Sequence, residues 1–217
     1  MKVLFLHQSY RRAGLERREH VRQLIEIVKT LGRFVCERDE AKARARDRKL
    51  IENMGGEIRT TFRQDIMPRL STGFFQEAPI KGRGKLFPQP RLEDSRLFDA
   101  ALKLGFRLIV AGDVAVPPQV FDASIPDLKV ARFGRADAPS GAGEDSVHSY
   151  VERGTILANW ISHHHACALL VRPDNHVYGI ARGADGILPL IRECERGLRA
   201  GGAAARSTVD SSVGTGG

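Results

Sequence analysis

The sequence predicts an α/β protein in which a helical arm precedes a smaller mixed domain. Apolar residues recur at three- and four-residue steps over 15–38, which is typical of an amphipathic helix. Prolines and glycines cluster over 63–92, and beyond about residue 95 short apolar runs alternate with helical patterns. These observations divide the chain into a helical arm over 1–62, a linker over 63–94, a domain over 95–200 and a disordered tail over 201–217.

Composition indicates a globular chain and limits its function classes. The 217 residues are 42% hydrophobic and 28% charged, which excludes wholesale disorder. No apolar run, Cys167–Val171 included, approaches the roughly 20 residues that a bilayer span needs. No signal peptide is recognised at the start, and three cysteines that are far apart and odd in number favour a reduced, cytoplasmic setting.

Charge is distributed unevenly along the chain. The formal net charge is +8, of which +7 lies in the first 69 residues. Such a basic segment can indicate nucleic-acid binding. Acidic residues are interleaved throughout it and it carries no recognisable nucleic-acid motif, so solvated helix faces are the favoured interpretation.

Two helices are expected in the arm. A second helix over 39–53 could begin at Asp39 as its N-cap and end at Gly55-Gly56, although its apolar face is thin. The first helix should be only partly covered by residues 39–70. Its stripe consists of Val21, Leu24, Ile25, Val28, Leu31 and Val35.

The domain should contain two strands, a helix, a β-hairpin and a last helix. This order resembles the second half of a thioredoxin-like α/β domain, with a C-terminal β-hairpin and helix. The hairpin turn is predicted at Pro173-Asp174-Asn175, and the last helix should end at Gly201-Gly202. The expected ranges are a short helix at 97–103, strands at 106–110 and 128–133, a helix at 147–161, hairpin strands at 167–172 and 176–181, and a helix at 187–198.

Three adjacent histidines and three cysteines are candidate reactive groups. Adjacent side chains in His163-His164-His165 point in diverging directions, so we expect no metal site there. Cys36, Cys167 and Cys194 are far apart and form no Cys-X-X-Cys pair, so we expect structural thiols. No catalytic, cofactor-binding or metal-binding residue is therefore predicted.

Two further motifs have alternative interpretations. Gly82-Arg83-Gly84-Lys85 lacks the spacing of a phosphate-binding loop, so a flexible turn is favoured. Arg172-Pro173-Asp174 fits a hairpin turn, and the alternative is a surface that docks a partner domain. No Gly-X-Gly-X-X-Gly follows any predicted strand.

Three segments together resemble FAD-dependent aromatic-ring hydroxylases of the 3-(3-hydroxyphenyl)propionate and phenol hydroxylase type. Residues 16–22, continuing to 46–47, resemble the helical stretch after the flavin-binding core. Residues 84–91 resemble the linker into the C-terminal domain. Residues 97–99, 104–108, Trp160 and 168–177 resemble that domain itself, which is thioredoxin-like and redox-inactive in the family.

This resemblance implies a monooxygenase that uses FAD and NAD(P)H to hydroxylate phenolic compounds. The flavin-binding motifs of the family would precede Met1, so no cofactor-binding or catalytic residue is carried over. One hypothesis is a C-terminal fragment, inactive alone, that forms a homo-oligomer or acts with a flavin-domain chain. The other is a stand-alone docking or dimerisation module without catalysis. No nucleic-acid or membrane partner is expected.

Overall fold

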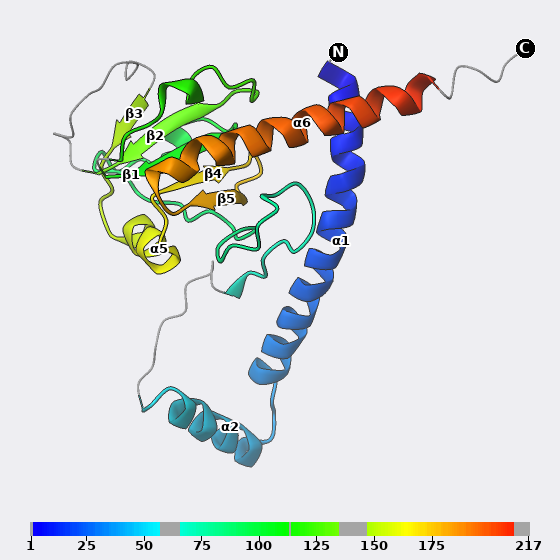
Figure 1. The fold of residues 1–217 in the computed structure, drawn as a ribbon. Helices are drawn as coiled ribbons and strands as arrows, with labels where there is room; N and C mark the ends of the chain where they lie inside the picture. Colours follow the sequence, from blue (N-terminus) through cyan, green and yellow to red (C-terminus); the bar gives the residue numbers. More distant parts are fainter. Residues whose placement is uncertain (1, 57–65, 113, 135–146, 211–217) are drawn as a thin grey trace, which may run out of the picture.

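A computed structural model describes residues 2–56, 66–112, 114–134 and 147–210, with side chains described from residue 17 to residue 200 within these ranges. A long helix stands beside a sheet-containing domain and crosses a second long helix near its own beginning (Figure 1). The α/β class and the helical arm are therefore confirmed.

The domain is built on a five-stranded mixed sheet with the order β3-β2-β1-β4-β5. Strand β1 pairs in parallel with β2, and β2 pairs in parallel with β3. Strand β4 runs antiparallel to both β1 and β5, so β4 and β5 form the predicted hairpin. The strands are β1 (Arg107–Ala111), β2 (Lys129–Phe133), β3 (Val147–Tyr150), β4 (Ala168–Val171) and β5 (Val177–Ala181).

Helices cover the sheet on both faces. Alternate strand residues such as Leu108 and Leu170 pack under α6 (Ile187–Asp210), whose Ile187 and Leu190 are buried. The intervening residues, including Ile109 and Leu169, pack against α5 and α4 on the other face. Each fully buried aliphatic side chain contributes about 1.5–3 kcal/mol relative to exposure. The helices of this second layer are α4 (Phe98–Ala101) and α5 (Ile156–His164).

The arm consists of α1 (Lys2–Val35) and α2 (Glu40–Asn53). Helix α1 begins earlier than the predicted range of 15–38, whereas α2 has the predicted N-cap: the Asp39 carboxylate accepts a 3.0 Å hydrogen bond from the Lys42 amide. Among the described residues, no helix combines the length and apolar character that crossing a bilayer requires.

The predicted helix over 147–161 is wrong in its first part. Val147–Tyr150 forms β3 at the sheet edge, in register with β2, and only Ile156–His164 is helical. Pairing with β2 outweighs the helical spacing of the apolar residues. Glu152 then accepts hydrogen bonds from the Leu157 and Ala158 amides at 2.9 and 3.2 Å, which satisfies the beginning of α5.

Two short 3₁₀ turns complete the fold. The connection from β1 to β2 contains η1 (Pro118–Val120), and η3 (Ala184–Gly186) leads into α6. The sequence predicted that the last helix ends at Gly201-Gly202 and that a disordered tail follows. In the structure, helix α6 continues through these glycines to Asp210. Residues 211–217 lie outside the described part of the chain.

The segment predicted as a linker packs along β5. The Gln76 and Gly84 amides donate to the carbonyls of Tyr178 and Val177 at 3.0 and 2.9 Å. This segment therefore covers the outer edge of the hairpin, which would otherwise expose unpaired backbone groups. At Gly84, φ is +75°, and a side chain would overlap the carbonyl oxygen of Leu70. The division of the chain at residues 62, 94 and 200 stays a prediction.

Candidate functional site

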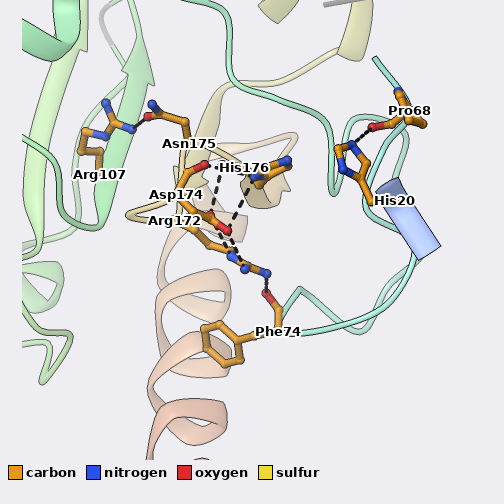
Figure 2. A network of polar contacts seen from close by, with 8 residues as sticks. All are labelled: His20, Pro68, Phe74, Arg107, Arg172, Asp174, Asn175 and His176. Carbon is orange, nitrogen blue, oxygen red and sulfur yellow. Dashed lines mark hydrogen bonds and ion pairs between the residues drawn. The ribbon is translucent and has the colours of Figure 1, made fainter. Parts of the chain in front are cut away.

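The hairpin turn between β4 and β5 holds a network of polar side chains, shown in Figure 2. The Arg172 guanidinium donates to both Asp174 carboxylate oxygens at 3.1 and 2.8 Å. It also donates to the Phe74 carbonyl at 3.1 Å and lies 4.6 Å from the centre of the Phe75 ring. One arginine therefore joins the turn to the segment that precedes the domain.

Asp174 is held in its ionised form. Burial by itself would raise the pKa of this carboxyl, but hydrogen bonding to His176 and the nearby Arg172 outweigh it and hold the pKa well below its usual range. The side chain of His176 lies 3.6 Å from Asp174 Oδ2. The turn is therefore a fixed charged unit at neutral pH.

The same turn meets the helical arm. The ring of His20, on α1, stands edge-on to the ring of His176 with 6.1 Å between their centres. His20 Nε2 donates a hydrogen bond to the Pro68 carbonyl at 2.9 Å (Figure 2). This bond joins α1 to the segment that connects the arm to the domain. In this structure Arg172-Pro173-Asp174 belongs to the hairpin turn. His176, which follows it, contacts the helical arm through His20.

A second polar network lies behind the turn and was missed from sequence. Arg107 is fully buried in β1, and its guanidinium pairs with Asp99 at 2.5 Å and donates to the side-chain oxygen of Asn175. It lies 5.8 Å from the ring centres of both Phe87 and Phe98. Its Nε has no hydrogen-bond partner among the described residues. An arginine inside an apolar run was the signal available in the sequence.

The three adjacent histidines diverge as expected. His164 is buried, stacked on Trp160 at 4.0 Å, while His163 and His165 are exposed. Burial lowers the pKa of His164, with smaller contributions from Lys85 and His163, although its hydrogen bond to the Trp160 carbonyl acts the other way. Within the described ranges no group of histidines, cysteines and acids could hold a metal ion.

The three cysteines are unpaired thiols in separate environments. Cys36 is exposed, Cys167 is half-buried and Cys194 is buried in α6. Burial raises the pKa of Cys194 to about 12 and also raises the pKa of Cys167. A thiol that resists ionisation is a poor nucleophile, so these two positions favour a structural role.

The motif Gly82-Arg83-Gly84-Lys85 forms a turn that packs on the domain. Gly82 has a φ of +102° and its α-carbon faces the rings and methyl groups of His164 and Ile180. The motif does not lead into a helix, so it cannot present amides to a phosphate at a helix N-terminus.

The apolar stripe of α1 is only partly covered, as the sequence predicted. Val21 and Ile25 are each 47% exposed, Val28 is 58% exposed and Leu31 is 50% exposed. Leu24, which turns toward the domain, is half-buried. This stripe is the largest set of exposed aliphatic side chains on one described helix.

Comparison with known proteins gives relatives that are named as hydroxylases. No family model matches the chain. The probable NADH-specific resorcinol 4-hydroxylase of Rhodococcus jostii (strain RHA1) is 27% identical over 192 residues, which are 82% of this chain and 32% of that protein. The 3-(3-hydroxy-phenyl)propionate/3-hydroxycinnamic acid hydroxylase of Mycobacterium sp. (strain JLS) is 29% identical over 189 residues, or 76% of this chain and 32% of the relative.

Solved structures overlap this chain more loosely. The flavin-dependent monooxygenase PieE, in complex with FAD and substrate, is 19% identical, with 79% of this chain and 32% of that chain aligned at a TM-score of 0.43. The rebeccamycin biosynthetic enzyme RebC with reduced flavin is 17% identical, with 82% and 35% aligned at a TM-score of 0.41.

The chain thus spans about a third of the length of the curated relatives it matches. The resemblance predicted from the sequence is confirmed: this chain is similar to part of an aromatic-ring hydroxylase, as expected for the C-terminal part.

Proposed function

We propose that this chain is the C-terminal part of an FAD- and NAD(P)H-dependent monooxygenase that hydroxylates phenolic aromatic compounds, and that it is inactive alone. The observation that carries the proposal is the match to one third of two kinds of aromatic hydroxylase. In such enzymes the flavin carries the oxygen chemistry, while protein groups orient the substrate and exclude water.

The described residues give no support to flavin binding by this part. Dinucleotide sites use a parallel strand that leads through a glycine-rich turn into the N-terminus of a helix. Strand β1 ends at Ala111 and the described chain after it continues through the 3₁₀ turn η1. FAD, NAD(P)H and the phenolic substrate would therefore bind residues outside this chain.

The location of the protein is a separate part of the proposal. A cytoplasmic setting fits the unpaired cysteines.

The test begins with the purified chain and FAD. We expect no flavin absorbance to survive gel filtration, and no NADH oxidation in the presence of resorcinol or 3-(3-hydroxyphenyl)propionate. Retained flavin or substrate-dependent NADH oxidation by the chain alone would contradict its inactivity. The second step adds the chain to a Rhodococcus hydroxylase that lacks its C-terminal third. Recovery of hydroxylation supports the proposal, and failure to associate with any such flavin-bearing part counts against it.

The second candidate is a stand-alone docking or dimerisation module without catalysis. The exposed stripe on α1 favours it, because a contiguous aliphatic surface on a long helix is typical of an interface. Association with a flavin-bearing chain separates the two candidates, since only the first requires it.

A further inference from the structure

His164 is a buried imidazole with one ring nitrogen left unused. It lies at the end of α5, is 2% exposed, and stacks on the Trp160 ring. Nδ1 lies 2.8 Å from the Trp160 carbonyl oxygen, and because a carbonyl only accepts, Nδ1 carries the proton. Nε2 is then the unprotonated nitrogen of the neutral ring, and it has no hydrogen-bond partner among the described residues.

The Gly82 turn, residues 80–87, closes over the ring edge that carries this nitrogen. Gly82 is buried, and a Cβ atom at its position would lie only 2.6 Å from His164 Cδ2, the ring carbon bonded to Nε2. The same Cβ atom would lie 2.7 Å from a methyl group of Ile180 in β5. Bare backbone therefore packs against the imidazole, so closely that Nε2 is shut off from water.

The surroundings of the ring oppose a positive charge on it. Lys85 and Lys81 act on His164 from the Gly82 turn, and His163 acts on it from α5, with 4.9 Å between the ring centres. From β5 the neighbouring side chain is the uncharged Ile180. Within the described ranges no carboxylate is among the groups that act on this imidazole. A proton on Nε2 would therefore create a buried donor without an acceptor, among groups of the same sign.

The Gly82 turn holds two other parts of the protein. The Gly84 amide donates to the Val177 carbonyl at 2.9 Å, and the Val177 amide donates to the Lys85 carbonyl at 2.9 Å, which covers the outer edge of β5. The Gly84 carbonyl accepts a hydrogen bond from the Leu70 amide at 2.8 Å. Leu70 belongs to the segment that leads from the arm and that is joined to α1 at Pro68. Opening of the turn would break these backbone contacts.

We propose that the Gly82 turn and His164 form a pH-sensitive latch, in which protonation of Nε2 opens the turn, uncovers the outer edge of β5 and loosens the segment that leads to the arm. In the closed state Nε2 has neither water nor an acceptor, so it binds a proton only after the turn has moved away. In the open state the ring is hydrated and takes up a proton as an ordinary histidine does. The proposal does not depend on the flavin assignment.

Proton linkage sets the size of the expected effect. Because only the open state binds the proton, the fraction of open molecules is constant at high pH and rises as the pH falls below about 6.5. Between pH 7.5 and pH 5.5 the open fraction should increase about tenfold. The direction agrees with the burial that lowers the pKa of His164 in the closed state.

Amide hydrogen exchange of the full chain, resolved by residue with NMR, measures the opening. The amides of Gly84, Phe87 and Val177 report on the Gly82 turn, and the amides of β1 and β4 report on global unfolding. Protection factors are corrected for the intrinsic effect of pH on exchange. We expect the turn amides to be less protected than those of β1 and β4, and to lose about tenfold in protection between pH 7.5 and pH 5.5.

Two variants remove the titrating group and a third is the matched control. His164→Gln stays uncharged over this pH range, and His164→Phe also keeps an aromatic ring against Trp160. His163→Gln makes the same change at the exposed neighbouring residue. The tenfold response should be retained in His163→Gln and lost in both His164 variants. Far-ultraviolet circular dichroism checks that each variant keeps its secondary structure.

Three results of the exchange experiment would overturn the proposal. The first is unchanged protection of the turn amides in the wild-type chain between the two pH values. The second is an equal pH response in the wild-type and both His164 variants. The third is equal protection of the Gly82 turn and of β1 and β4, which would mean that the turn opens only when the domain unfolds. Nitrogen-15 NMR of the His164 ring at pH 7.5 should find the proton on Nδ1, and a proton on Nε2 would refute the latch.

Discussion

Removing the carboxylate of Asp99 should destabilise the domain more than any other single polar change in its core. Asp99 carries the negative charge paired with Arg107, which is fully buried near two aromatic rings and whose Nε has no hydrogen-bond partner among the described residues. Breaking a fully buried ion pair by deleting one side costs about 3–5 kcal/mol. Asp99 itself is 26% exposed and Asn175 still accepts from Arg107, so we expect about 2–3 kcal/mol for Asp99→Ala.

The matched comparison is Arg107→Met, alone and combined with Asp99→Ala. Methionine fits the apolar surroundings and leaves Asp99 free to be hydrated, so Arg107→Met should cost about 1 kcal/mol. The double variant should be more stable than Asp99→Ala, because no buried charge is left unpaired. Urea unfolding followed by circular dichroism measures these free energies. An Asp99→Ala protein within about 0.5 kcal/mol of wild type, or a double variant less stable than Asp99→Ala, would refute the reasoning.

Three further predictions concern titration, thiols and the arm. Because burial lowers the pKa of His164, the unfolded chain binds a proton at this residue before the folded chain does as the pH falls. The contribution of His164 to the free energy of unfolding should be complete above about pH 6.5 and should decrease below it. The decrease should be smaller in His164→Phe. Native thiol titration should detect Cys36 quickly and Cys194 only after unfolding, and insulin reduction that Cys36→Ser abolishes would contradict the absence of redox function. At concentrations where the chain is monomeric, amide hydrogen exchange should be fast in α1 and α2 and slow in β1 and β4. Uniform strong protection of all four elements would show that the arm already has a complete core.

Local patterns in the sequence were enough to predict most of the sheet and its turn. Strands β1, β4 and β5 are largely apolar runs bounded by turn residues, β2 lies within the predicted range of 128–133, and α2 has its cap at Asp39. Strand β3 was missed because it lies at the sheet edge, where His148 and Ser149 are exposed together and the alternation typical of a half-buried strand is absent. Its pairing with β2 is a tertiary contact, which a short stretch of sequence does not reveal.

The polar networks could not be predicted, because their members are far apart in the chain. Arg107 is paired with a carboxylate in α4 and donates a hydrogen bond to an amide oxygen in the hairpin turn, so its burial makes sense only once the fold brings these groups together. His20 and His176 likewise meet across the boundary between arm and domain. The sequence predicted a turn at 173–175 and a helix at 15–38, but it contained no signal that the two touch.

The hairpin turn owes its position to both networks together. Asn175 adopts a φ of +64°, which asparagine tolerates better than most residues, and its side chain reaches back to Arg107 and Asp99. On the other side of the turn the ring of His176 meets His20 of α1, and Arg172 donates to the Phe74 carbonyl in the segment that precedes the domain. A buried ion pair inside the domain therefore sets where the arm is fastened, and the direction in which α1 presents its exposed stripe follows from it.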